Sequence, residues 1–190
     1  MLRAVAYSHQ LLQERLAPGD MAIDATAGNG QDTLFLTRLT RPGGVVFAFD
    51  VQETAIDATR RLLEREGVSP DGFQLFHAGH ETLREMIPAR WHGLIGAVIF
   101  NLGYLPGSDK TVTTSAANTV AAMKASLTML RPGGVLVMVV YTGHPGGTEE
   151  AEAVLEFAKD LTGDGFHAVE YRTLNARSSP PFVIAMEKQR

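Results

Sequence analysis

The stretch Asp24-Ala25-Thr26-Ala27-Gly28-Asn29-Gly30-Gln31-Asp32-Thr33 decides the fold of this chain. It lies between a strand expected at residues 21–25 and a helix expected at residues 32–39, so it is predicted to be the turn that joins them. Gly28 and Gly30 allow the backbone to pass close to a ligand, and the following helix offers unpaired N–H groups. We therefore expect an anionic or polar ligand group here. The alternative is an ordinary strand-to-helix turn with a polar cap.

Outward from this turn, short apolar runs alternate with longer helical patterns, and no repeat or low-complexity tract interrupts them. This order predicts one α/β domain with mostly parallel strands. The last two strands should form an antiparallel hairpin, because a polar, Pro-containing stretch joins them. The other helices are expected at residues 5–16, 53–65, 81–86, 115–130 and 149–161, and the other strands at residues 45–50, 73–77, 94–100, 135–141, 168–173 and 182–186.

Length and composition limit the classes of protein that remain. The 190 residues, 45% of them apolar, suit a single domain over residues 1–190, with a helix within residues 1–18 packing on it. The longest apolar runs are about a third of the roughly 20 residues that a bilayer requires, so we expect a cytoplasmic protein without a membrane span. The absence of Cys excludes disulfides, iron–sulfur clusters and thiol nucleophiles. A net charge of −4 still permits a local basic patch.

Asp50 closes the second expected strand. It follows Gly30 by about 20 residues, the separation at which an acidic side chain accepts hydrogen bonds from the ribose hydroxyls of an adenosine cofactor. Asp50 is therefore a candidate for ribose binding. The alternative is a capping role for the helix that begins near Glu53.

A Gly-rich turn with a ribose carboxylate suits both NAD and S-adenosylmethionine. A dinucleotide fingerprint places Gly or Ala three residues after Gly30, where this chain has Thr33. Asp24 would repel a pyrophosphate, whereas it would attract the ammonium of a methionine moiety, directly or through water. These residues favour S-adenosylmethionine. The alternative is that Asp24 binds only N–H groups of the turn.

The fourth strand is followed by Asn101-Leu102-Gly103-Tyr104. Asn101 presents an amide acceptor and donors, and Tyr104 presents an aromatic face, so together they would hold an amine. Methyl transfer to nitrogen needs a free lone pair in line with the methyl group, and the useful acts are orienting the amine and removing its proton. The alternative is a polar turn that ends a buried strand, with Pro106 supplying the bend.

Histidines lie after two other strands. His77 and His80 flank the point where an adenine ring is expected, and Gly79 would contact that ring through its backbone. We expect no metal site, because two histidines three residues apart without further ligands are a weak metal motif. His144 follows the fifth strand, and we expect it to contact substrate or relay a proton. An ordinary loop histidine is an equal alternative.

Five motifs follow one another along nearly the whole chain: Asp-Ala-Thr-x-Gly-Asn-Gly-x-Asp-Thr at 24–33, Phe49-Asp50-Val51-Gln52, His80-Glu81, Asn101-Leu102-Gly103-Tyr104-Leu105-Pro106-Gly107 with Asp109-Lys110, and Tyr141-Thr142-Gly143-His144. In this order they resemble a family of small class I methyltransferases known as rRNA methylases. That family includes an enzyme that methylates the aminomethyl nitrogen of a wobble uridine in tRNA. The combination is far more specific than a single Gly-rich turn.

The resemblance implies a Rossmann-like, seven-stranded sheet with helices on both faces and S-adenosylmethionine over the first strand ends. Gln31 departs from the family pattern, in which His is common, so its side chain is given no role. The residues implied for the cofactor are Asp24, Thr26, Gly28, Asn29, Gly30, Asp32, Thr33, Asp50, Gln52, Gly79, His80, Asn101 and Leu102. Those expected to contact substrate are Tyr104, Lys110, Tyr141, His144 and Arg177, and the residues expected to act in catalysis are Asn101, Tyr104 and His144.

The favoured function is therefore S-adenosylmethionine-dependent methylation of the aminomethyl group of 5-aminomethyl-2-thiouridine in the tRNA anticodon. The alternatives are an rRNA or small-amine acceptor, a nicotinamide oxidoreductase, and an RNA-binding scaffold without turnover. The oxidoreductase is disfavoured because no Tyr-x-x-x-Lys pair is present. Exposed helix faces make a homodimer plausible. The basic residues expected near RNA are Lys110, Lys124, Arg172 and Arg177, with solvated surface charge as their alternative role.

Overall fold

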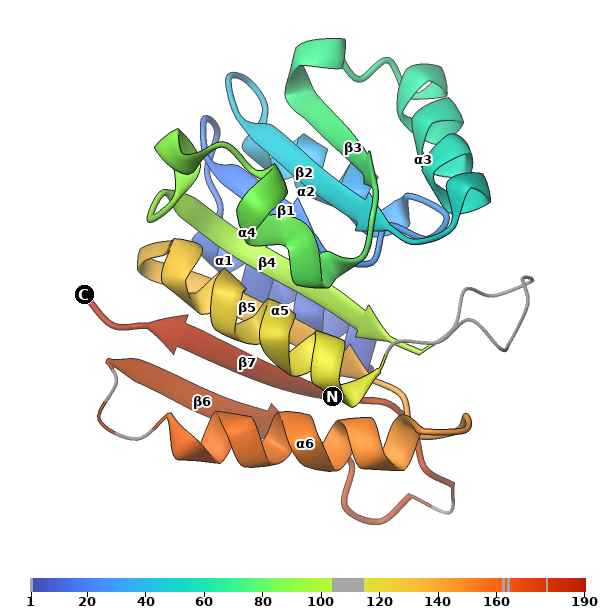
Figure 1. The fold of residues 1–190 in the computed structure, drawn as a ribbon, viewed down its shortest axis with the longest axis vertical. Coiled ribbons are helices and arrows are strands. Elements are labelled where there is room, and N and C mark those ends of the chain that lie inside the picture. The colour runs from blue at the N-terminus through green and yellow to red at the C-terminus, as the bar shows by residue number, and fades with distance from the viewer. Residues whose placement is uncertain (1, 104–114, 162, 164, 177) are drawn as a thin grey trace.

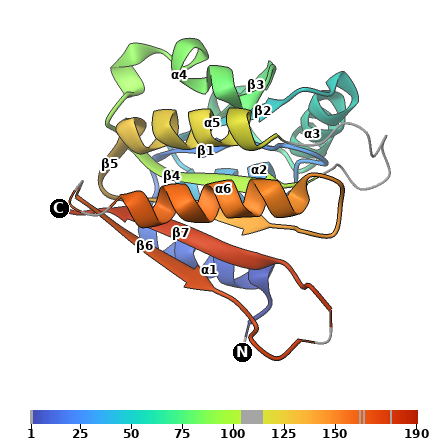
Figure 2. The ribbon, with the colours of Figure 1, turned by 60° about the horizontal axis from the view of Figure 1, so that its bottom comes forward.

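A computed structural model describes residues 2–103, 115–161, 163, 165–176 and 178–190 of the chain. Its strands form one seven-stranded sheet in the order β3-β2-β1-β4-β5-β7-β6 (Figure 1). Helices α4, α5 and α6 cover one face, whereas α1, α2 and α3 cover the other (Figures 1 and 2). The predicted α/β fold, with its sheet and its two helical layers, is therefore confirmed.

The strands are parallel except at the C-terminal edge of the sheet. There, β7 pairs antiparallel with both β5 and β6, which confirms the predicted hairpin. The central strands are almost fully buried because helices cover both of their faces. The strand bounds are β1 Met21–Asp24, β2 Val45–Asp50, β3 Phe73–His77, β4 Ile95–Leu102, β5 Leu130–Val140, β6 Phe166–Tyr171 and β7 Phe182–Lys188.

The helices agree closely with the expected positions. The short helical pattern at residues 81–86 is a 3-10 turn, His80–Thr82, followed directly by α4. Two further 3-10 turns are Pro70–Gly72 and Ala89–Trp91. Within the described ranges, no helix is long and apolar enough to cross a membrane. The helix bounds are α1 Ala4–Arg15, α2 Gln31–Thr40, α3 Glu53–Arg65, α4 Leu83–Met86, α5 Ala116–Met129 and α6 Gly147–Asp160.

Two apolar layers hold the helices on the sheet. Met123 of α5 and Val154 of α6 are fully buried in one layer. Leu12 of α1 and Leu36 of α2 are fully buried in the other, so α1 and α2 both pack on the sheet. Burying one such side chain contributes roughly 1.5–3 kcal/mol. This packing fixes α1 beside the strands whose ends carry the polar motifs.

β5 differs most from expectation. It begins at Leu130, whereas the Pro-Gly-Gly sequence at residues 132–134 had predicted a break before residue 135. Leu130 pairs with Ile95, but the next pair is Val135 with Ala97, so the extra residues bulge out within the strand. A Cβ on Gly134 would lie 2.9 Å from the Ile95 carbonyl oxygen, which explains why the bulge requires glycine.

Candidate functional site

The carboxyl ends of β1, β2 and β4 bring three polar motifs to one edge of the sheet (Figure 1). Asp24 is paired in register with Ile99 of β4, two residues before Asn101. Asp50 ends the neighbouring strand β2. Gly103, directly after β4, and the segment after β5 reach the same edge, as expected for parallel strands. The three segments singled out in the sequence therefore meet. They are called below the first turn, which follows β1 within residues 24–33, the second turn, which follows Asp50, and the third turn, which begins at Asn101.

Asp24 lies below the first turn and is fully buried. Its Oδ1 accepts a hydrogen bond from the Thr26 backbone N–H at 3.1 Å, and its Oδ2 accepts one from Thr33 Oγ1 at 2.6 Å. Burial, reinforced by the nearby charge of Asp32, raises the pKa of Asp24 to about 7. One oxygen thus binds an N–H group of the turn, as the alternative interpretation expected, whereas the other binds a hydroxyl group in the first turn of α2.

The two glycines of the first turn both have positive φ, 54° at Gly28 and 80° at Gly30. Gly30 is the N-cap of α2, so Asp32 lies in the first helical turn. A Cβ on Gly30 would lie 2.9 Å from Thr59 Cα on α3, and Thr59 Oγ1 donates to the Gly28 carbonyl oxygen at 3.2 Å. The close approach that the sequence assigned to a ligand is therefore made, at Gly30, to α3.

Asp50 connects the first and second turns. Its Oδ2 accepts a hydrogen bond from the Gly28 backbone N–H at 2.9 Å, and its Oδ1 accepts one from the Gln52 N–H at 2.9 Å. Gln52 is the N-cap of α3, so Asp50 is not the cap residue itself, although it binds the N–H of the residue at which that helix begins. The carboxylate is only partly buried and retains acceptor capacity for a ribose hydroxyl.

Asn101 is the last residue but one of β4 and forms two hydrogen bonds with residues of the first motif. Its backbone N–H donates to Thr26 Oγ1 at 2.7 Å, and its side-chain Nδ2 donates to Asp32 Oδ2 at 2.6 Å. The neighbouring Leu102 is fully buried. Burial of the phenol raises the pKa of Tyr141, and the nearby charge of Asp32 raises it further. Asp32 therefore connects the first turn to the carboxyl end of β4.

His9 is a member of this cluster that the sequence did not identify. Its Nε2 lies 2.6 Å from Asp32 Oδ1, and its ring stacks on Phe35 with centroids 4.0 Å apart. His9 lies within the helix expected at residues 5–16, where it is at helical spacing with apolar residues. That spacing alone does not reveal a partner 23 residues away.

His80 is buried at 8% exposure beneath this edge. Its Nδ1 donates to the Ala25 carbonyl oxygen at 3.3 Å, and burial lowers its pKa, so the ring is neutral near pH 7. Its Nε2 has no hydrogen-bonding partner among the residues that the structure describes. His77 is exposed instead, with Nε2 3.0 Å from the Val51 carbonyl oxygen.

The segment after β5 reaches the end of β4. A Cβ on Gly103 would lie 3.5 Å from His144 Nε2 and 3.8 Å from Tyr141 Cβ. His144 Nδ1 is 3.0 Å from the Pro145 carbonyl oxygen. Tyr141 and His144 thus border the described end of the third motif.

The remaining predicted residues have different surroundings. Asn29 is exposed on the first turn, and Gly79 directly precedes the 3-10 turn that begins at His80. Lys124 lies over the Phe157 ring at 5.8 Å, and Arg172 lies over Phe182 at 3.7 Å, so both cations contact aromatic rings of the protein itself. Three predicted residues fall outside the described part of the chain: Tyr104, Lys110 and Arg177.

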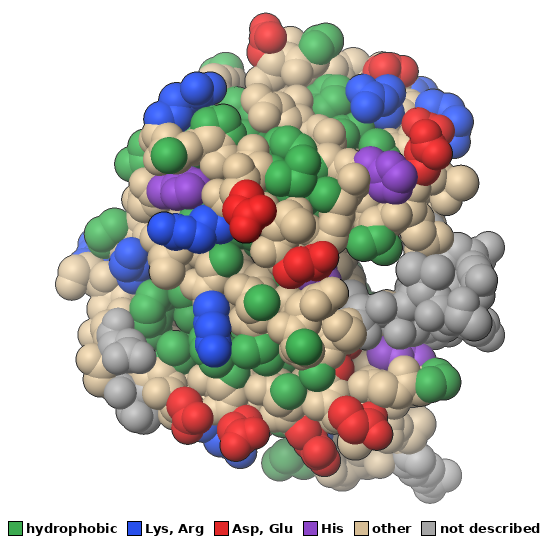
Figure 3. All heavy atoms as spheres, viewed as in Figure 1, with side chains coloured by type: hydrophobic (Ala, Val, Ile, Leu, Met, Phe, Trp, Pro, Cys, Tyr) green, Lys and Arg blue, Asp and Glu red, His purple; other side chains and the backbone are tan. Residues whose placement is uncertain are grey.

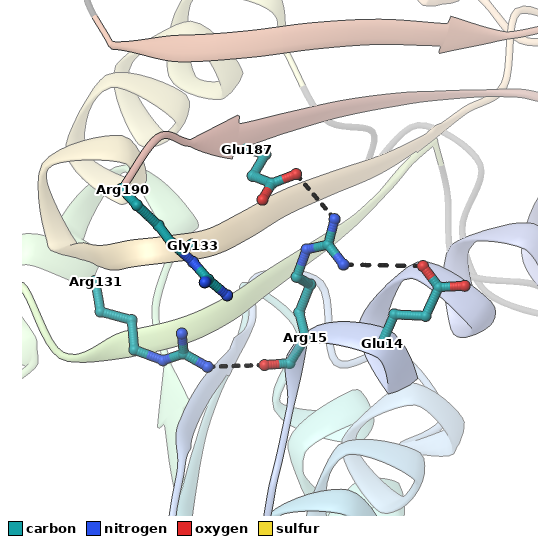
Figure 4. Close-up of a pocket in the computed structure, with 6 residues that line it drawn as sticks. All are labelled: Glu14, Arg15, Arg131, Gly133, Glu187 and Arg190. Atoms are coloured by element: carbon teal, nitrogen blue, oxygen red, sulfur yellow. Dashed lines mark hydrogen bonds and ion pairs between the residues drawn. The ribbon is translucent and has the colours of Figure 1, made fainter.

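The structure also has a cavity of about 350 Å³ at the opposite edge of the sheet, where β5 begins and β7 ends (Figure 4). Arg15 is 2.9 Å from Glu187, and Arg131 binds both the Arg15 carbonyl oxygen and Asp20. Carboxylates therefore largely balance the guanidinium groups there. In the described ranges, no three His, Asp or Glu side chains are placed to share a metal ion.

Known proteins show the same fold and much of the same sequence. A "putative rRNA-methylase" of Clostridium thermocellum has a TM-score of 0.94 at 34% identity, covering 99% of this chain and 98% of that chain. A "putative methyltransferase" of Streptococcus mutans, solved in complex with SAH, has a TM-score of 0.88 at 40% identity, covering 99% of each chain. The tRNA (mnm5s2U34)-methyltransferase of Arabidopsis thaliana, a chloroplastic protein, is 35% identical over 98% of this chain and 70% of its own length.

The fold and the polar edge define the class of protein: a class I methyltransferase that uses S-adenosylmethionine. The model of the family described as "Putative rRNA methylase" matches residues 46–187. The chain therefore belongs to the rRNA methylase family, and the predicted resemblance is confirmed.

Proposed function

We propose that this enzyme methylates the aminomethyl nitrogen of 5-aminomethyl-2-thiouridine at the wobble position of tRNA. The observation that carries the proposal is the polar cluster at the end of β4, where Asp32 fixes the side-chain amide of Asn101. The name and the similarity of the Arabidopsis relative support the tRNA acceptor. The family description favours rRNA as the second candidate acceptor.

Charge at the first and second turns suits a cationic nucleoside. Burial raises the pKa of Asp24 most, and the nearby charges of Asp32 and Asp50 raise it further, so these three carboxyl groups lie close together. This field attracts a sulfonium and an ammonium, whereas it repels a pyrophosphate. We place the methionine end beside residues 28–32, the ribose at Asp50 with Gln52, and the adenine near Gly79 and His80.

The acceptor amine must be neutral to attack. An alkyl ammonium has a pKa near that of Lys, about 10.4, and both burial and a nearby positive charge disfavour it. S-adenosylmethionine, when bound, supplies an electrophilic methyl group. Because Asn101 Nδ2 donates to Asp32, its Oδ1 remains to accept a hydrogen bond from the amine. Tyr104, His144 or a water molecule would accept the proton.

RNA must approach a face that is not strongly acidic. Figure 3 shows a row of acidic side chains over α6, and the exposed residues of that helix include Glu149, Glu152, Glu156 and Asp160. Phosphates would be repelled there. We propose that the tRNA anticodon instead contacts the edge bearing Tyr141 and His144, with Lys110, Lys124, Arg172 and Arg177 as candidate phosphate contacts.

The wider setting is part of the same proposal. We infer a single catalytic domain over residues 1–190, a cytoplasmic location, and a homodimer formed through exposed helix faces. The monomer–dimer state would be read by light scattering at micromolar concentration.

The proposal is tested with tRNA from cells that lack this protein. Nucleoside mass spectrometry should show accumulated 5-aminomethyl-2-thiouridine, which purified enzyme with S-adenosylmethionine converts to the methylaminomethyl form. If the enzyme methylates rRNA fragments or small amines but not tRNA, the proposed tRNA acceptor is wrong. Calorimetry should show binding of S-adenosylhomocysteine and no binding of NADH, and the opposite result would favour an oxidoreductase.

A further inference from the structure

His9 belongs to α1, outside every motif that marks the methyltransferase site. Its imidazole is held from two sides, by the stacked ring of Phe35 and by Asp32 at 2.6 Å. The backbone beneath it is equally fixed, because the neighbouring Ser8 and Leu12 are fully buried. A side chain on a helix that packs on the sheet is thus locked against the first turn.

Asp32 has a hydrogen-bond partner on each oxygen. Oδ1 receives His9 Nε2, and Oδ2 receives Asn101 Nδ2, both at 2.6 Å. An ionised carboxylate only accepts hydrogen bonds, so His9 carries its proton on Nε2 and Asn101 presents its NH₂ group. The side chains of Asp32 and His9 are 13% and 28% exposed, so water has limited access to replace either donor.

We propose that His9 is a positioning residue for methyl transfer: through Asp32 it fixes the Asn101 amide so that Oδ1 faces the acceptor amine. This rests on the proposed function, which gives Asn101 that contact. Without His9, the Asp32 carboxylate loses the donor that sets its rotation and no longer holds the amide in one orientation. Misplacement of a reacting group by about 1 Å can reduce a rate about 100-fold.

A double-mutant cycle tests this coupling. His9→Leu keeps an apolar contact with Phe35 but removes the donor, whereas His9→Gln retains a donor at a similar reach. With saturating S-adenosylmethionine, His9→Leu should lower the single-turnover rate about 10- to 100-fold, and His9→Gln should restore it to within about 5-fold. In an Asn101→Ala background, His9→Leu should cost less than about 3-fold, because the amide it positions is gone.

Gln10→Leu is the matched control, since Gln10 lies next along α1 and donates to Glu14 on the exposed surface. It should leave the rate unchanged. An equal loss from His9→Leu in both backgrounds would overturn the positioning role and indicate a merely structural one. Full activity of His9→Leu would overturn it as well.

A spectroscopic measurement separates this inference from the choice of substrate. The Asn101 side-chain amide resonances of the protein with S-adenosylhomocysteine should shift in His9→Leu and return in His9→Gln. Resonances that do not respond to His9 would overturn the inference even if tRNA is methylated. If the resonances respond while the wild-type enzyme leaves tRNA unmethylated, the tRNA acceptor is wrong and positioning of Asn101 by His9 is supported.

Discussion

The Asp50 carboxylate accepts the backbone N–H of Gly28 at 2.9 Å, across the two turns that end β1 and β2. The same side chain is proposed to bind the cofactor ribose, so one residue would both shape the first turn and hold the ligand. The first role contributes to the stability of the free protein, whereas the second contributes only when the ligand binds.

Asp50→Ala should therefore weaken both binding and folding. Loss of a carboxylate that accepts backbone N–H groups costs about 1.5–3 kcal/mol, and we expect S-adenosylhomocysteine affinity to fall at least about 10-fold. Calorimetry and urea denaturation measure the two effects. Asp71→Asn, on the exposed 3-10 turn before β3, should change neither. Unchanged affinity in Asp50→Ala would contradict the ribose assignment.

Gly30→Ala should destabilise the protein for two reasons. The residue has φ near 80°, and its new Cβ would lie 2.9 Å from Thr59 Cα, a backbone atom that cannot easily move. Gly67→Ala is the control, because Gly67 also has positive φ, 67°, but has open space around it. We expect about 1 kcal/mol from backbone strain at Gly67 and about 1–3 kcal/mol more at Gly30, measured by denaturation. Equal losses would show that contact with α3 is unimportant.

Stability should depend on pH through Asp24. Burial raises its pKa in the folded protein to about 7, whereas an unfolded Asp titrates near 4. The folded state therefore binds this proton more tightly than the unfolded state does. The stabilisation that results is fully present below about pH 4 and is lost as pH rises from about 4 through 7. Asp24→Asn should flatten this dependence by up to about 1 kcal/mol per pH unit. Parallel curves for the two proteins would place the pKa of Asp24 at its ordinary value.

Thr26 should be required for its hydroxyl. Its Oγ1 accepts the Asn101 backbone N–H at 2.7 Å, which joins the first turn to the end of β4. Thr26→Val leaves that N–H without its acceptor and should cost about 1–3 kcal/mol of stability together with a lower methyl-transfer rate. Thr26→Ser keeps the oxygen and should behave like wild type in both assays. A Thr26→Val protein with full rate and stability would exclude this link.

Local sequence patterns anticipated the sheet, the helices and the convergence of Asp24, Asp50 and Asn101, because parallel strands place their carboxyl ends together. They did not anticipate His9, whose partner lies on another helix and carries no periodic signal. The bulge in β5 was also missed, since Pro-Gly-Gly more often interrupts a strand than lies within one. Gly30 was correctly identified as a close-approach position, but the approaching group is Thr59 of α3.

Thr59 supports the Gly28–Gly30 turn from behind, through a hydrogen bond and a close backbone contact. That turn is consequently shaped during folding rather than upon encounter with its nucleoside. Little conformational entropy of this turn then remains to be lost on association, so ordering of residues 28–30 should add nothing to the binding heat capacity.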